Sequence, residues 1–159
     1  MTKECIMATD VQSSFKWYSW LFLGLELVWS LGISLMTHKT IAPPSVRWII
    51  TAAFIGLTLT FGLIDFVLSS DSAGRDDTPV DRWTIVHTLA GVVFGIWLVP
   101  LIYVLMIVIM WECFEFSVAG FGDQEVIANR GVDIGVAVGG WLIVVVALMA
   151  INHVPFPLA

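Results

Sequence analysis

The sequence predicts an all-α integral membrane protein with about five transmembrane segments, forming a single domain over residues 1–159. Hydrophobic residues make up 58% of the chain and charged residues only 13%, whereas soluble domains carry about 25% charged residues. The mean hydropathy is +0.93. Several apolar runs are long enough to cross a hydrocarbon core of about 30 Å. The lipid bilayer is therefore the expected surroundings of the chain.

The net charge and the cysteines limit which partners and which covalent cross-links the chain can be expected to have. The formal net charge of −6 argues against nucleic acid as a partner, because neutralising phosphate requires Lys and Arg. The two cysteines, Cys5 and Cys113, lie before the first apolar run and within the fourth. They form no disulfide framework, and Cys113 is expected to serve in packing.

The first predicted segment covers residues 17–37, after a polar N-terminal stretch at 1–16. Trp17 and Trp20 at its start are typical of a membrane interface. Glu26 falls inside the segment, where a carboxylate costs about 2.5–3.5 kcal/mol on membrane-insertion scales. We therefore expect Glu26 to face protein or water, either as part of the ligand-binding site described below or against a partner subunit.

The second segment is expected at residues 46–68, with Arg47 as an interfacial anchor. The Pro43-Pro44 pair should separate it from the first segment, because proline breaks a helix interior. An acidic loop follows at 69–82. Calcium binding would require a defined ligand spacing and a glycine-assisted turn, so an ordinary solvated loop is the simpler interpretation.

Residues 83–116 form the longest apolar stretch, about 50 Å as a single helix and too long for one crossing. Pro100 favours a break, since the residue before a proline disfavours helical geometry. We therefore predict a short third segment at 83–98 that forms a tight hairpin with a fourth at 101–118. One long kinked helix is the alternative. After a polar turn, the fifth segment should cover 131–151.

Lysine and arginine counts predict the orientation, because these residues concentrate in cytoplasmic loops. With five segments, one side carries five of them and the other only Lys39 and Arg47. The five are Lys3, Lys16, Arg75, Arg82 and Arg130. We expect a multi-pass protein of the cell membrane whose N-terminus and whose loops at 69–82 and 120–130 are cytoplasmic. The tail at 152–159 would lie on the opposite side.

Polar and small residues recur at helical spacing in the third and fourth segments. His87, Gly91 and Gly95 are four residues apart, and small residues at this spacing let helix backbones approach closely in lipid. Glu112 and Glu115 are three apart, so they are neighbours on one helix face.

The fifth segment offers two adjacent stripes of small residues. One contains Asp133, Ala137 and Gly140, and the other consists of Gly131, Gly135 and Gly139. Either stripe could pack closely against a neighbouring helix.

A hairpin returns the fourth segment to the side from which the third began. His87, Glu112, Glu115 and Asp133 are therefore expected at one membrane depth, as a ligand-binding and metal site near the cytoplasmic face. Asp123, in the polar turn, should reach the mouth of this site.

Such a cluster suits several roles. A bound proton or metal ion relieves the repulsion between crowded carboxylates. One imidazole with two or three carboxylates suits a first-row divalent metal, while magnesium or calcium would use oxygen ligands alone. The alternative is hydrogen bonding that holds the helices together, with Asp133 capping the last helix. Catalysis is a third role.

The order of these residues also resembles a known pattern. This pattern consists of His87 before Gly91, Trp111-Glu112 before Glu115, a Gly-Asp turn, and Asp133 before a glycine-containing helix. It is similar to that of the VanZ-like and YjdF-like families of small membrane proteins. The resemblance covers roughly residues 81–150. It implies a shared membrane scaffold and site, and VanZ-like proteins are associated with resistance to a glycopeptide antibiotic. At Asn129-Arg130-Gly131 the chain departs from the more acidic, tryptophan-containing approach of YjdF-like members, so the role of the turn does not carry over.

These observations lead to three functional hypotheses. The first is binding or movement of a cation, either a proton or a divalent metal ion, or of a small polar ligand. The second is an accessory or structural subunit, in a larger membrane complex or a homo-oligomer. The third is metal-assisted hydrolysis of a lipid or envelope substrate, with Glu112 or Glu115 as general base. No P-loop, dinucleotide-binding glycine motif or H-E-x-x-H occurs, and on balance we do not expect an enzyme.

Overall fold

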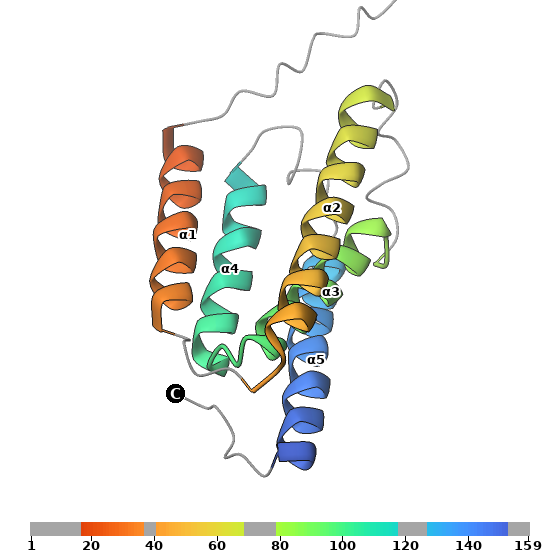
Figure 1. Ribbon diagram of the computed structural model, residues 1–159. Coiled ribbons are helices and arrows are strands. Elements are labelled where there is room, and N and C mark those ends of the chain that lie inside the picture. The colour runs from red at the N-terminus through yellow and green to blue at the C-terminus, as the bar shows by residue number, and fades with distance from the viewer. Residues whose placement is uncertain (1–16, 37–40, 69–78, 118–126, 153–159) are drawn as a thin grey trace, which may run out of the picture.

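The structure is a computed structural model that describes residues 17–36, 41–68, 79–117 and 127–152. Over these residues the chain forms five helices and no strand, so the predicted all-α class is confirmed (Figure 1). The helices are α1 (Trp17–Met36), α2 (Pro44–Leu68), α3 (Arg82–Ile96), α4 (Leu101–Ser117) and α5 (Ile127–Asn152). The N-terminal stretch at 1–16, most of the acidic loop, most of the polar turn with Asp123, and the tail lie outside the described residues.

Two of the helices are long and apolar enough to cross a membrane. They are α2, over Pro44–Ile64, and α5, over Ile127–Asn152. No residue in the most apolar stretch of α2 is buried, so much of the apolar surface of this helix is exposed. The two helices favour a membrane location in general terms, because exposed apolar surface of this length suits lipid better than water.

Two helix starts differ from the predicted boundaries. Helix α2 begins at Pro44 rather than 46, which is compatible with proline because an N–H in the first turn has no intrahelical acceptor. Helix α5 begins at Ile127 rather than 131. The expectation that Asp133 caps this helix is therefore wrong, since Asp133 lies in its second turn.

Helix α3 begins with a capping box at the end of the acidic loop. The Asp81 Oδ1 atom accepts hydrogen bonds from the backbone N–H groups of Trp83, at 2.7 Å, and Thr84, at 3.0 Å. The Thr84 hydroxyl in turn accepts from the backbone N–H of Asp81 at 3.2 Å. Asp81 therefore has a defined structural role, because it satisfies N–H groups that lack intrahelical partners.

The predicted break between the third and fourth segments is confirmed. Helix α3 ends at Ile96 and α4 starts at Leu101, with Leu98 between them at a positive φ of 51°. The indole Nε1–H of Trp141 on α5 donates to the backbone carbonyl of Val99 in this turn, at 2.7 Å. This buried hydrogen bond fixes the turn against α5.

The hairpin is tight only at its turn. The main interface of α3 is with α5, and α4 packs against α1 and, less extensively, against α5. In Figure 1, α4 lies beside α1, whereas α3 is behind α2 and crosses α5. Because α3 and α4 do not pack closely along their length, the contact between them at the cluster is made by side chains.

Close packing of α3 on α5 depends on glycine. A Cβ atom on Gly91 would overlap the backbone carbonyl of Ala137, and one on Gly140 would lie 2.6 Å from the carbonyl oxygen of Thr88. The predicted packing role of the α3 glycines is therefore confirmed. On α5 the stripe through Ala137 and Gly140 forms the contact. The other stripe does not, since added Cβ atoms would meet nothing within 4 Å at Gly131, Gly135 and Gly139.

A polar contact and a ring contact join α1 to α4. The Ser19 hydroxyl donates to the carbonyl oxygen of Ser117 at 3.0 Å, and the two hydroxyl oxygens are 2.8 Å apart. Nearer the other end, the rings of Trp29 and Tyr103 meet edge to face at 5.5 Å. Both contacts hold α4 in the orientation that turns its glutamates toward α3.

Candidate metal centre

Four ionisable side chains from three helices are buried at one end of the bundle. His87 on α3 is 7% exposed, Glu112 and Glu115 on α4 are each 6% exposed, and Asp133 on α5 is 1% exposed. Charged side chains are seldom buried to this degree without partners. The structure thus brings together the four residues that the sequence predicted to share a depth.

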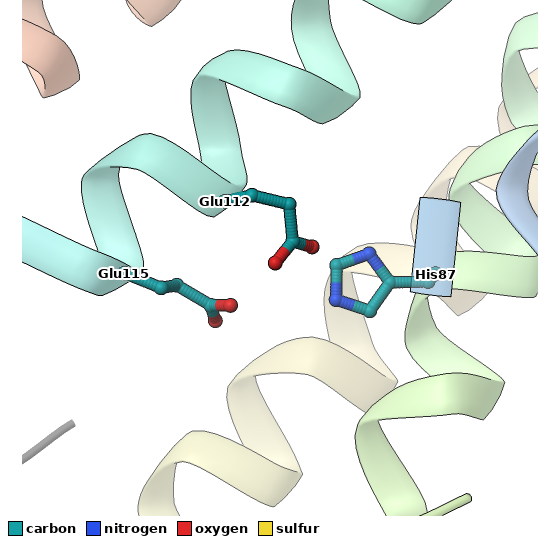
Figure 2. A group of neighbouring side chains, drawn as sticks. All are labelled: His87, Glu112 and Glu115. Carbon is teal, nitrogen blue, oxygen red and sulfur yellow. The ribbon is translucent and has the colours of Figure 1, made fainter. Parts of the chain in front are cut away.

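His87, Glu112 and Glu115 form the centre of the cluster. Each offers one potential ligand atom, and these three atoms all lie within 4.8 Å of one another. Figure 2 shows both carboxylates projecting from α4 toward the imidazole of α3. Two ligands of one zinc-sized ion are at most about 4.2 Å apart, given metal–ligand bonds of about 2.1 Å. The limit of 4.8 Å is larger than this value, so binding one ion would draw the ligand atoms closer together.

Asp133 approaches the imidazole from α5. Its Oδ2 atom is 3.8 Å from Nε2 of His87, which is within ion-pair range but beyond a hydrogen bond. The buried Asn129 side chain donates from Nδ2 to the same oxygen at 3.3 Å. Asp133 is therefore an oriented neighbour of the histidine rather than one of the three atoms at the centre.

The sequence interpretation did not assign Asn129 to the site. A signal was available, because Asn129 and Asp133 are four residues apart and residues at this spacing are neighbours on a helix. This spacing is informative only if both residues lie in one helix, and the last helix was expected to start at 131, after Asn129. The earlier start of α5 places both residues on one helical face.

Taken by themselves, the four side chains carry a net negative charge when all carboxylates are ionised. Three carboxylates then face one imidazole, which contributes at most a single positive charge. Repulsion between like charges is stronger in a buried, low-dielectric setting than in water. A bound divalent cation would compensate most of this negative charge, and protonation of a carboxylate would compensate part of it.

Other predicted candidates do not join the cluster. Glu26 lies on α1 and is half-buried, with its Oε2 atom buried and without a hydrogen-bond partner in the described parts of the chain. It is absent from the His87–Glu112–Glu115 group. Asp123 lies outside the described residues. Cys113 is exposed, so it does not serve in packing within the described part of the chain.

The fold and site define a helical protein with two helices able to cross a membrane and a buried cluster of one histidine and three acids. Comparisons with protein-family models, curated proteins and solved structures find no match for the chain. The resemblance to VanZ-like and YjdF-like proteins therefore stays a prediction.

Proposed function

We propose that this chain is a multi-pass membrane protein that binds a divalent first-row metal ion through His87, Glu112 and Glu115. The observation that supports the proposal is the convergence of three buried ligand atoms, from two helices, within 4.8 Å of one another. An imidazole nitrogen with carboxylate oxygens is a donor set that manganese, iron, cobalt and zinc accept. Magnesium and calcium prefer oxygen ligands, so the histidine favours the transition metals.

Asp133 would act on the imidazole rather than on the ion. Histidine ligands commonly donate their second ring N–H to a carboxylate, which fixes the ring and raises its basicity. The Oδ2 atom of Asp133 is 3.8 Å from Nε2, an arrangement that would leave Nδ1 for the ion, and Asn129 donates a hydrogen bond to the same Oδ2 atom. A small movement of the ring toward Asp133 would complete this pair.

Titration calorimetry on the purified full chain in mild detergent tests the proposal. We expect one equivalent of Mn²⁺ or Zn²⁺ to bind, and His87→Ala and Glu112→Gln each to abolish binding. Glu26→Gln is the matched control, since it removes a buried carboxylate outside the group of potential ligands, and it should bind as wild type. Equal binding by His87→Ala, Glu112→Gln and the wild type would overturn the metal site.

Two other outcomes would replace metal binding with a different function. A wild-type protein that binds no metal, but takes up a proton that Glu112→Gln does not, would make the cluster a proton site. Stoichiometric co-purification with other membrane subunits, again without metal, would make the carboxylates part of an assembly. Turnover of a lipid-phosphate or ester substrate by metal-loaded protein would add hydrolysis to the binding function.

The proposal places five segments across the membrane with the metal centre near the cytoplasmic face. The support is the count of Lys and Arg on the two sides. Cys5, in the N-terminal stretch, gives a direct test once Cys113 is replaced by Ala. A membrane-impermeant maleimide should label Cys5 in inside-out vesicles and not in sealed right-side-out vesicles, and the opposite pattern would reverse the orientation.

A further inference from the structure

In the described parts of the chain, the helix ends that lie away from the His–Glu cluster carry no acidic residue. The sequence contains no Asp or Glu at 27–64, 88–111 or 134–159. These stretches include the α2 start, the turn between α3 and α4, and the end of α5. Their two basic residues are Lys39 and Arg47. A guanidinium stays charged at all ordinary pH values, and the described helix ends around Arg47 offer it no carboxylate.

Arg47 is held in place by an aromatic platform. Its guanidinium carbon lies over the ring of Trp97, 4.8 Å from the centroid. Trp48 packs edge-on against the same ring, with centroids 5.2 Å apart. The indole Nε1–H of Trp97 donates to the hydroxyl of Thr51 at 3.1 Å, and that hydroxyl donates to the carbonyl of Arg47 at 2.8 Å. The arginine is thus pre-positioned by contacts between α2 and the end of α3.

The donors of Arg47 are incompletely used. Its Nε atom is buried and makes no hydrogen bond within the described parts of the chain, and the residue as a whole is only partly exposed. Because Nε is buried, stacking on a ring leaves the fork of the two terminal N–H groups at the edge of the guanidinium for a ligand. That fork matches the oxygens of a phosphate, which it binds through two parallel hydrogen bonds.

We propose that Arg47, stacked on Trp97, binds the phosphate of an anionic phospholipid at the membrane interface opposite the metal centre. Tryptophan and arginine near a helix end are typical of the headgroup region. The outward apolar side chains of α2, including Ile49, Ile55 and Leu59, continue from Arg47 toward the bilayer centre and would contact the acyl chains. The described helix ends around Arg47 offer no acidic partner for a choline or ethanolamine group, so a headgroup without a positive charge is favoured.

The inference rests on the membrane placement proposed above and is independent of metal binding. The chain also provides a matched control for the arginine. Arg130 on α5 lies over the ring of Phe116 at the same 4.8 Å distance, but at the acid-rich end of the bundle. An Arg–aromatic pair alone is therefore present at both ends, and only the one at the acid-free end should select an anionic lipid.

Native mass spectrometry of the full-length protein in mild detergent tests the inference, with phosphatidylglycerol, phosphatidylcholine or inorganic phosphate added. We expect the wild type to retain phosphatidylglycerol in preference to phosphatidylcholine. Arg47→Gln should weaken phosphatidylglycerol binding by about tenfold, as expected for charge-assisted hydrogen bonds, and Arg130→Gln should not. Millimolar inorganic phosphate should not displace the lipid, because it lacks the acyl contacts with α2.

Arg47→Lys keeps the result interpretable if Arg47→Gln fails to fold. Lysine keeps the charge and loses the planar fork, so phosphatidylglycerol binding should weaken while the helical content is unchanged. Equal lipid binding by wild type and a folded Arg47 variant would overturn the inference, as would an equal loss in Arg130→Gln. Recovery of the chain in the soluble fraction of cells would overturn the membrane placement itself, and with it the lipid site.

Discussion

Adding one methyl group at Gly140 tests the packing that positions the site. A Cβ atom there would lie 2.6 Å from the carbonyl oxygen of Thr88 and 3.3 Å from the backbone nitrogen of Val92. An ordinary contact starts at 3.4 Å, so relief requires α3 and α5 to separate by 0.8 Å at this point. Both obstructing atoms are backbone, and no side-chain rotation can absorb the shift.

The neighbouring Gly139 supplies the reference for this substitution. Its Cβ would meet nothing within 4 Å, so Gly139→Ala should gain up to about 1 kcal/mol from the higher helix propensity of alanine. Gly140→Ala gains the same propensity term but incurs overpacking, which typically costs about 1–3 kcal/mol. The difference between the two variants isolates the packing cost, and we expect Gly140→Ala to be less stable by about 1–3 kcal/mol.

The assay is equilibrium unfolding in mixed detergent, followed by circular dichroism, for both variants and the wild type. Metal binding should respond in parallel, because Thr88 follows His87 directly and a displaced α3 moves the imidazole relative to Asp133. Equal stability of Gly140→Ala and Gly139→Ala would show that α3 and α5 do not approach as closely as described, and would refute the reasoning.

Three further predictions concern the Asp81 cap of α3, the Asn129 side chain that orients Asp133, and the pH dependence of metal binding. Asp81→Ala should lower the free energy of unfolding by about 1 kcal/mol through loss of the α3 cap, measured by the same unfolding assay; no change would mean that the capping box is not formed. Asn129→Ala should weaken metal binding about tenfold, because Asp133 loses the group that orients it, and calorimetry showing wild-type affinity would contradict this. Acidification from about pH 7.5 to about pH 5.5 should also weaken metal binding, because the imidazole and carboxylates bind metal in their deprotonated forms. Affinity that is unchanged or higher at the lower pH would exclude the histidine as a ligand.

Several features of the fold were predictable from local signals. Pro100 interrupts an apolar run that is too long for one crossing, and the structure ends α3 before it and starts α4 after it. The spacing of His87, Gly91 and Gly95 indicated one packing face, and both glycines lie against α5. These signals are strong because each depends on geometry within a single helix.

Features that depend on which helices meet were not predictable. Two small-residue stripes on α5 are equivalent by composition, and only the structure shows that the one with Gly140 contacts α3. Lipid-facing and protein-facing sides are both apolar in a membrane protein, so hydrophobic patterning does not separate them. The same limit applies to Arg47, whose position over Trp97 joins residues fifty positions apart.

Some residues of the candidate site could be predicted from the sequence and others could not. Glu112 and Glu115 could be paired from their three-residue spacing, and the hairpin placed them at the depth of His87. Glu26 could not be assigned, because its position depends on how α1 packs. Helix α1 packs against α4, and Glu26 is not part of the His87–Glu112–Glu115 group. Asn129 was missed because helix starts are the least certain boundaries in a sequence.

The most direct test of the central claim is zinc K-edge X-ray absorption on protein loaded with one equivalent of Zn²⁺. We predict nitrogen and oxygen ligands at about 2.0–2.1 Å from the zinc, together with scattering from the more distant atoms of a single imidazole ring. In His87→Ala the imidazole scattering should vanish, while Glu26→Gln should give the wild-type spectrum. A spectrum without imidazole in the wild type, or one unchanged in His87→Ala, would contradict a metal centre built from His87, Glu112 and Glu115.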